Sequence, residues 1–316
     1  MTERYNKLFN LLSNGGTVIL DGGVSTELER RGASMMDGIW SGHVALDAFD
    51  ILVDTHRAYI DAGANIVTTN TYASSRLMLE SCGYHDQVKE INERSLEAAN
   101  LAREKCGAPD VLIAGSISHV LPFLAGAEGA TQQPAIPEIT LVDAYKEMIC
   151  FHENGNADLL LLEMMSIPNR MQPLFEAASQ STLPVWCGLS AKKEDLNSPI
   201  TAWHDKNVKF SENIKNAIGY DFDVIGIMHT SANLIAETIP MLSKEYPGPI
   251  MVYPDSGYFK APNWQFIDVM SPSDLRTLAS GWLSQGVQII GGCCGLGPEH
   301  IEAIASLKSI QIKKDK

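Results

Sequence analysis

The sequence predicts an α/β protein folded as a (β/α)8 barrel, also called a TIM barrel. Eight short apolar runs rich in β-branched residues recur along the 316-residue chain, and stretches with helical periodicity separate them. Most of the runs are apolar at every position, which is typical of parallel strands covered on both faces. Eight strand–helix units in one chain of this length indicate the barrel. A doubly wound open sheet is the alternative, because it shows the same alternation.

The eight expected strands are bounded by glycine, proline or small polar residues, which favour turns. In chain order they are 17–23, 65–71, 111–118, 158–165, 184–190, 223–230, 249–257 and 287–295.

The helical stretches between these strands begin and end at recognisable signals. The stretch 47–62 ends before Gly63, and glycine is well suited to the left-handed position after a helix. The stretch 273–284 ends before Gly286 in the same way, and Pro298 stands where a first-turn proline opens a last helix. Further helices are expected at 86–105, 141–153 and 233–244.

Two long connections, 24–46 and 119–138, follow the first and third strands. The carboxyl ends of barrel strands carry the active site, so both connections are candidates for loops that cover a substrate. Surface excursions without a function are the alternative.

A single barrel domain is expected to span residues 1–316, because no low-complexity linker divides the chain. Residues 1–16 form an N-terminal extension, and 309–316 form a flexible basic tail.

The charge balance argues against a nucleic-acid partner. The chain has 24 basic and 38 acidic side chains, a formal net charge of −14, and its lysines and arginines are scattered except in the tail. No segment has the pattern of a signal peptide or the roughly 18 to 20 apolar residues needed to cross a bilayer. We therefore expect a cytoplasmic protein with small-molecule substrates and no membrane partner.

Adjacent cysteines, Cys293 and Cys294, follow the last strand within Gly-Gly-Cys-Cys-Gly. Neighbouring side chains of a strand point to opposite faces, so both thiols reach one ion only where the strand has ended and glycines permit a turn. Catalytic Zn²⁺ sites combine thiolate and imidazole ligands and keep one position open. His229, at the end of the sixth strand, is the best-placed third ligand. Buried structural cysteines are the alternative.

Two carboxylates also lie at strand ends, Asp21 on the first strand and Glu163 on the fourth. A carboxylate after such apolar residues is costly unless it meets a cation or hydrogen-bond donors. The ammonium group of an amino-acid substrate would satisfy both, and its carboxylate would suit the turn at Gly22 and Gly23 or the hydroxyls of Thr69 and Thr71. A structural network around the two carboxylates is equally consistent with the sequence.

Other motifs give no support to a different cofactor. The chain has no dinucleotide-binding glycine fingerprint, no phosphate-binding P-loop and no Gly-x-Ser-x-Gly elbow. Five histidines in expected loops or on helix faces are interpreted as solvated: His43, His56, His85, His152 and His204.

Six motifs together resemble the homocysteine S-methyltransferase family, which includes the S-methylmethionine-dependent and betaine-dependent enzymes. They occur in family order over residues 17–308, and Gly-Gly-Cys-Cys-Gly is the most specific. The motifs are Asp21-Gly22-Gly23, Thr68-Thr69-Asn70-Thr71-Tyr72, Gly115-Ser116-Ile117, Leu162-Glu163, Tyr253-Pro254-Asp255-Ser256-Gly257 and Gly291-Gly292-Cys293-Cys294-Gly295.

The resemblance implies a zinc-dependent barrel in which the thiol of homocysteine takes the open metal position and attacks a methyl group carried by sulfonium or quaternary nitrogen. The zinc cysteines map onto Cys293 and Cys294. The implied catalytic side chains are Asp21 and Glu163, which bind the substrate ammonium group. The implied carboxylate site is the Gly22-Gly23 turn with Thr71.

Three positions depart from the family pattern. Met228-His229 stands where Asn-Cys usually supplies a third zinc thiolate, so the ligand set becomes two cysteines and a histidine. Ser118-His119 replaces a usual Gly-Pro, and Asp255 replaces a more familiar asparagine. These changes indicate a divergent member.

The sequence therefore predicts a zinc-dependent S-methyltransferase that makes methionine from homocysteine, or a close variant acting on another small thiol, selenol or donor. A barrel metalloenzyme of another class, such as a lyase or hydrolase, and a non-catalytic thiol-binding protein are the alternatives.

Overall fold

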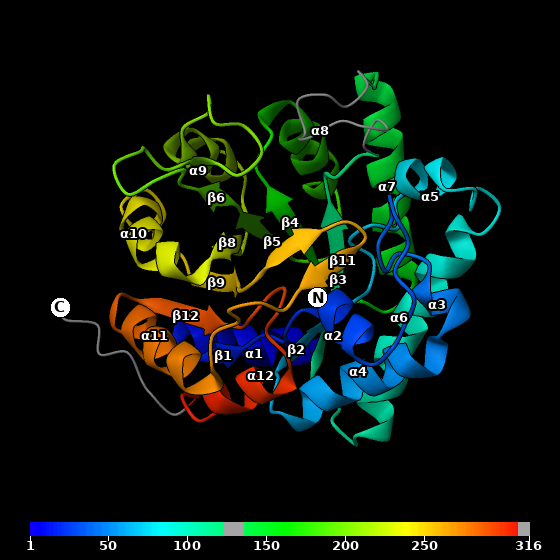
Figure 1. Ribbon diagram of the computed structural model, residues 1–316, viewed down its shortest axis with the longest axis horizontal. Coiled ribbons are helices and arrows are strands. Elements are labelled where there is room, and N and C mark those ends of the chain that lie inside the picture. Colours follow the sequence, from blue (N-terminus) through cyan, green and yellow to red (C-terminus); the bar gives the residue numbers. More distant parts are fainter. Residues whose placement is uncertain (123–135, 309–316) are drawn as a thin grey trace.

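The computed structural model describes residues 1–122 and 136–308 and shows a ring of parallel strands surrounded by helices (Figure 1). A parallel bridge between Leu20 and Ile66 joins the two edge strands and closes the ring. The predicted (β/α)8 barrel is confirmed, and the open-sheet alternative is wrong. Around the barrel the strands are β1 (Val18–Ile19), β12 (Val287–Ile290), β9 (Ile250–Asp255), β8 (Val224–Ser231), β5 (Val185–Leu189), β4 (Leu159–Met165), β3 (Leu112–Ser118) and β2 (Ile66–Thr68).

The expected strands exist, but several are shorter than expected. β12 ends at Ile290, so the Gly-Gly-Cys-Cys-Gly segment lies beyond the strand, where its backbone is free to turn. β4 is buried at every position and pairs with β3 so that Glu163 lies opposite Ser118. Glu163 therefore lies near the carboxyl end of a strand that is buried along its whole length.

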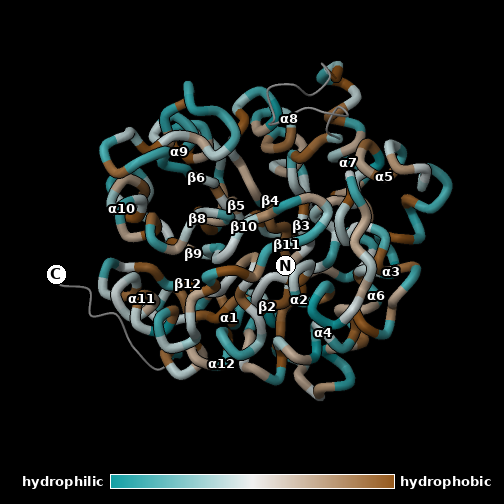
Figure 2. The backbone as a smooth tube through the Cα atoms, viewed as in Figure 1, coloured by the Kyte–Doolittle hydropathy of each residue, from teal (hydrophilic) through white to brown (hydrophobic). Residues whose placement is uncertain are grey.

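Helices cover the outside of the barrel, and hydrophilic residues gather on their outer turns and on the loops (Figure 2). The apolar faces of these helices pack on the strands and bury the outer face of the barrel sheet. The helices after the N-terminal segment are α2 (Val24–Arg30), α3 (Val44–Asp47), α4 (Phe49–Asp61), α5 (Arg76–Ser81), α6 (Val88–Lys105), α7 (Glu138–Asn154), α8 (Pro168–Ala178), α9 (Phe210–Ile218), α10 (Ala232–Ser243), α11 (Pro272–Ser284) and α12 (Pro298–Ala305).

The N-terminal segment forms helix α1 (Glu3–Ser13), which lies under the amino ends of the strands. Its Tyr5 side chain is buried, donates a hydrogen bond to Asp223 before β8 (2.5 Å) and accepts one from Trp186 in β5 (3.0 Å). At the other end of the helix, the Leu12 carbonyl accepts a hydrogen bond from Gln288 of β12 (2.6 Å). The helix thus closes the end of the barrel that faces away from the strand termini carrying the cysteines.

The long connections contain more structure than expected. The segment 24–46 includes all of α2 and the start of α3. Of the segment 119–138, residues 123–135 lie outside the described residues, as does the tail 309–316. Two small hairpins stand above the carboxyl ends of β5 and β9: β6 (Ala191–Lys192) with β7 (Thr201–Ala202), and β10 (Tyr258–Lys260) with β11 (Asn263–Gln265). Among the described residues, no helix is long and apolar enough to cross a membrane.

The interpretation of five histidines as solvated is wrong for His43, His56 and His152, which are buried. His85 is exposed as expected, and His204 is half-buried. His152 lies on the face of α7 that packs against β3, not on the solvent face. Its Nε2 lies 3.1 Å from the Ser116 carbonyl oxygen. Neither ring nitrogen of His56 has a hydrogen-bond partner among the described residues.

Burial without a partner lowers the pKa of His56 to about 4. The unfolded chain binds a proton below its ordinary pKa near 6.5 while the folded chain does not, so stability falls as the pH drops from about 6.5 toward 4. We expect this histidine to cost about 2 kcal/mol of stability between pH 7 and pH 5.

His56→Leu should raise the free energy of unfolding at pH 7 by about 1 kcal/mol, because it removes unsatisfied polar atoms, and should reduce the loss between pH 7 and pH 5. Urea unfolding at the two pH values measures both effects. The matched control is His85→Gln at an exposed position, and equal acid sensitivity of the two variants would contradict the assignment.

Candidate metal centre at the barrel mouth

The three predicted metal ligands meet at the carboxyl end of the barrel. The Cys293 sulfur lies 3.2 Å from His229 Nδ1 and 3.6 Å from the Cys294 sulfur. All three potential ligand atoms lie within 4.8 Å of one another. The structure therefore brings together side chains from β8 and from the segment after β12, as the sequence predicted.

Local backbone geometry places each ligand. His229 adopts a left-handed conformation (φ 46°), which is uncommon for a residue with a Cβ and marks a departure from regular strand geometry. Gly295 closes the cysteine turn with φ +84°, and a Cβ there would collide with the Ser256 carbonyl oxygen. The Cys293 amide donates to the Pro254 carbonyl oxygen (2.6 Å), so the turn is tied to the end of β9.

Glu163 lies behind His229. Its Oε2 is 2.9 Å from His229 Nε2, and both side chains are buried. The contact leaves Nδ1 on the side of the cysteines. A carboxylate on the far nitrogen of a ligating histidine fixes the ring orientation and raises the ligand's basicity, an arrangement common in metal sites.

The charges of the metal-free cluster support this geometry. Burial alone would lower the pKa of His229, but the nearby Cys294 thiol and the hydrogen bond with Glu163 outweigh it and raise that pKa to about 10. Hydrogen bonds from Cys293 and His229 lower the pKa of the Cys294 thiol, while burial raises the pKa of Cys293. The cluster thus stabilises a buried thiolate with a proton on the histidine, and a metal dication would replace that stabilising positive charge. Two thiolates and one imidazole suit a thiophilic ion such as Zn²⁺.

Asp21 is fully buried and accepts three hydrogen bonds from its surroundings. Its carboxylate receives the Thr68 amide (2.6 Å), the Thr68 hydroxyl (2.9 Å) and the Tyr253 hydroxyl (3.0 Å). Burial outweighs these bonds and raises its pKa to about 7. The carboxylate therefore takes part in the structural network that the sequence left open, and it links β1 to β2 and β9.

The expected carboxylate-binding groups are also engaged in the barrel wall. The Thr71 hydroxyl donates to the Ser116 carbonyl oxygen (2.8 Å) and lies 2.7 Å from the Thr69 hydroxyl. The Gly23 amide donates to the Leu296 carbonyl oxygen (3.1 Å). Gly22 allows close packing, since a Cβ there would collide with the Tyr59 ring and the Leu296 carbonyl oxygen.

Two aromatic residues complete the site without having been predicted. The Tyr253 hydroxyl contacts Asp21 and also the Gly22 carbonyl oxygen (2.7 Å). The Tyr72 ring centroid lies 5.4 Å from that of His229. Both tyrosines belong to motifs that carried the family resemblance, which was the available signal.

Asp255 also belongs to the mouth. It pairs with Ser231 at the carboxyl ends of β9 and β8. Burial raises its pKa to about 6, against the opposing effect of His229. It borders a hollow of about 600 Å³ that is also lined by Ser231, Ala232, Asn233, Ser256, Gly257, Tyr258, Ile267, Asp268, Met270, Asp274, Thr277 and Leu278.

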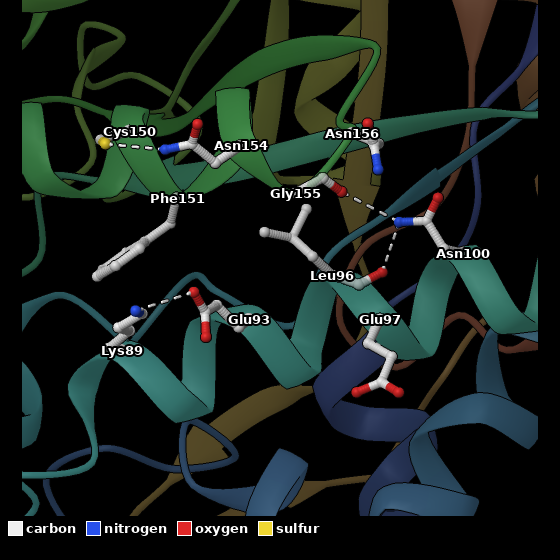
Figure 3. A pocket seen from close by; sticks show the side chains of 10 residues that line it. All are labelled: Lys89, Glu93, Leu96, Glu97, Asn100, Cys150, Phe151, Asn154, Gly155 and Asn156. Carbon is white, nitrogen blue, oxygen red and sulfur yellow. Dashed lines mark hydrogen bonds and ion pairs between the residues drawn. The ribbon is translucent and has the colours of Figure 1, made fainter.

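A groove of about 690 Å³ lies away from this centre, on the outer surface between α6 and α7 (Figure 3). Lys89 and Glu93 form an exposed ion pair along its α6 wall (3.7 Å), and Asn100 spans the groove to the Gly155 carbonyl oxygen (3.2 Å). None of the predicted ligands lines it, so we do not assign the chemistry to this groove.

Fold and site define a class: a TIM barrel with a buried two-cysteine, one-histidine cluster at the carboxyl ends of its strands. The family model described as homocysteine S-methyltransferase matches residues 18–307. The chain therefore belongs to the homocysteine S-methyltransferase family, which confirms the family and enzyme class predicted from its motifs.

Similar proteins agree with this assignment. The chain is 28% identical to a selenocysteine Se-methyltransferase of Brassica oleracea var. italica, covering 93% of this chain and 89% of that protein. It is 26% identical to homocysteine S-methyltransferase YbgG of Bacillus subtilis, covering 95% and 97%. The metallated form of the Escherichia coli homocysteine methyltransferase MmuM has the same fold, with a TM-score of 0.76, 22% identity and coverage of 94% and 98%.

We expect bound zinc near one ion per chain in the wild type and a large loss in Cys293→Ser, Cys294→Ser and His229→Ala, because each removes one ligand. Elemental analysis after dialysis measures the ion. Cys150→Ser is the matched control, since Cys150 is exposed. Full zinc content in His229→Ala would overturn the ligand set.

Glu163→Gln should weaken zinc binding by roughly 10- to 100-fold while leaving one site per chain, because the ligand set stays complete and only its support changes. Competition with a chromophoric chelator gives the affinity. An affinity equal to that of the wild type would show that Glu163 does not support His229.

Proposed function

We propose that the protein is a zinc-dependent S-methyltransferase that moves a methyl group from a sulfonium or betaine-type donor to the thiol of homocysteine, giving methionine. The observation that carries the proposal is the convergence of His229, Cys293 and Cys294 at the barrel mouth, with Glu163 behind the histidine. Family membership supports the same acceptor chemistry.

Zinc held by these residues would supply the Lewis acidity by which the substrate thiol releases its proton to solvent at neutral pH. The thiolate sulfur then attacks the methyl carbon, a new carbon–sulfur bond forms, and the bond from that carbon to the donor's onium atom breaks. The onium atom keeps the bonding electron pair and becomes neutral, so no oxidant or reductant is needed.

Glu163 has two tasks in this proposal. Its Oε2 holds the His229 imidazole with Nδ1 toward the cysteines. Its Oε1 has no hydrogen-bond partner among residues 1–122 and 136–308, so it can accept a hydrogen bond from the substrate ammonium group. The added negative character also matters, because two thiolates, one neutral imidazole and Zn²⁺ sum to zero formal charge, where three thiolates give −1. A carboxylate on His229 restores part of the electron donation that the missing thiolate would supply, and so keeps the bound thiolate nucleophilic.

Asp21 completes the acceptor site as a positioning residue. Its bonds to Thr68 and Tyr253 hold the turn that contains Gly22 and Gly23, where the substrate's amino-acid group is expected to bind. The pKa of Asp21 is raised to about 7, so part of its population is protonated at neutral pH. A nearby ammonium group would lower this pKa and favour the charged carboxylate.

The direct test incubates zinc-loaded protein with homocysteine and each of four donors: S-methylmethionine, S-adenosylmethionine, betaine and dimethylsulfoniopropionate. Mass spectrometry should detect methionine with at least one of them, and Cys293→Ser should reduce its formation by more than 100-fold. No methylated thiol from any donor would reject the proposal and favour a barrel metalloenzyme of another class or a thiol-binding protein.

A selenol acceptor is the second candidate, because relatives named as selenocysteine methyltransferases are among the similar proteins. Competition between homocysteine and selenocysteine for a limiting amount of donor distinguishes the two. A higher specificity constant for selenocysteine would reassign the acceptor.

Asp255 should favour cationic donors once it is ionised. Its pKa near 6 means that the carboxylate forms as the pH rises from 5 to 7, so the preference for S-methylmethionine over the neutral methyl iodide should grow over this range. Asp255→Asn should lower that preference at pH 7 by about 10-fold and remove its pH dependence. Using the ratio of the two rates cancels ionisation of the thiol acceptor, and an unchanged ratio would contradict a role for Asp255.

A further inference from the structure

A second polar cluster lies around the strand ends beyond Glu163. We call it the Arg170 cluster; it consists of His119, Tyr145, Arg170 and His204. His119 follows β3, Tyr145 lies in α7, Arg170 lies in the first turn of α8, and His204 follows β7. None of these side chains takes part in the metal centre or in the proposed acceptor site.

Arg170 has no acidic partner in the part of the chain that the structure describes. It is half-buried, and within residues 1–122 and 136–308 no carboxylate forms an ion pair with it. Its position in the first turn of α8 places a positive charge at the positive end of the helix dipole, which is unfavourable without an anion.

His119 presents a buried hydrogen-bond donor. Its Nε2 accepts from the amides of Ser166 (3.0 Å) and Ile167 (3.2 Å), which lie at the start of α8. The proton of the neutral ring must therefore lie on Nδ1. That atom is buried and has no hydrogen-bond partner in another described residue. Capping by His119 gives a structural meaning to the Ser118-His119 departure from the family pattern.

Tyr145 presents a second such donor. Its side chain is 2% exposed, and its hydroxyl has no partner among the described residues. Buried polar groups of this kind are rare and each costs stability. Two of them near an arginine that has no acidic partner among the described residues indicate a binding site.

Electrostatics keep the neighbouring imidazoles neutral. Burial, followed by the charges of His204, Arg170 and His229, holds the pKa of His119 well below its ordinary value. Burial, Arg170 and His229 similarly lower the pKa of His204 to about 3. The cluster thus combines the permanent positive charge of Arg170 with uncharged hydrogen-bond donors. The charge of His229 also contributes to the lowered pKa of both imidazoles.

We propose that the Arg170 cluster binds the carboxylate of the methyl donor. This inference rests on the proposed function and names the group by which the enzyme recognises its second substrate. The Arg170 guanidinium can bind a carboxylate by donating two parallel N–H hydrogen bonds to it. The His119 Nδ1–H and the Tyr145 hydroxyl can donate to the remaining lone pairs of the carboxylate oxygens.

The positions of the strand ends explain why the methyl donor, rather than the thiol substrate, reaches this cluster. Glu163 lies opposite Ser118 at the level of the metal centre. His119 and Ser166, which contact each other, are the first residues after β3 and β4 end, so this part of the cluster lies beyond the strand ends. The acceptor, with its thiol on the metal and its amino group at Glu163, occupies the inner level.

The test measures binding directly, by calorimetry on the zinc-loaded full chain without acceptor. The probes are dimethylsulfoniopropionate, which has a carboxylate, and trimethylsulfonium, which has none. We expect the wild type to prefer dimethylsulfoniopropionate by roughly 10- to 100-fold, Arg170→Met to abolish the preference, and Tyr145→Phe to reduce it several-fold. Arg276→Met, at an exposed arginine that contacts Ser306, is the matched control.

Equal preference in the wild type and in folded Arg170→Met would overturn the inference. Inorganic phosphate is a further probe: binding of phosphate that depends on Arg170, without any preference between the sulfonium probes, would replace the carboxylate by a phosphate ligand. The proposed function fails separately, when no donor yields a methylated thiol, and in that case an Arg170-dependent preference would still support the carboxylate site. Circular dichroism and thermal unfolding establish that each variant is folded.

Discussion

The hydrogen bond between His229 and Glu163 is the contact on which the candidate site depends. It joins β8 to β4 across the intervening β5, orients one imidazole nitrogen toward two cysteines, and places a carboxylate where a missing thiolate would otherwise supply electron density. The contact depends on the pairing of β4, β5 and β8, because the two residues are 66 positions apart and meet only when these strands lie side by side.

The same mouth is organised in two levels. At the inner level, Asp21, Thr68 and Tyr253 tie β1, β2 and β9 together beside the metal ligands. At the outer level, His119 connects the end of β3 to the start of α8. The groups to which we assign catalysis and binding therefore lie at strand ends and at a helix terminus rather than on long loops, which favours fixed geometry.

The sequence predicted the barrel and the ligand set because both leave local signals. Apolar runs mark the strands, and Cys293-Cys294 among glycines marks a turn at a strand end. The role of Glu163 as the partner of His229 was not predictable, because it depends on the register of β4 and β8. Likewise, the burial of His56 and His152 depends on which helix face meets the sheet, and residue type alone does not determine that face. The capping role of His119 required the position of α8, which was not among the expected helices although Pro168 lies in its first turn.

Helix α1 has a consequence for the order in which the molecule is completed. Its residues precede all eight barrel strands in the sequence, yet Tyr5 binds Asp223 and Leu12 binds Gln288, 218 and 276 positions away. Contacts of such sequence separation carry a large loop-closure cost and form late. Helix α1 therefore completes its contacts only after β5, β8 and β12 have taken their places in the ring.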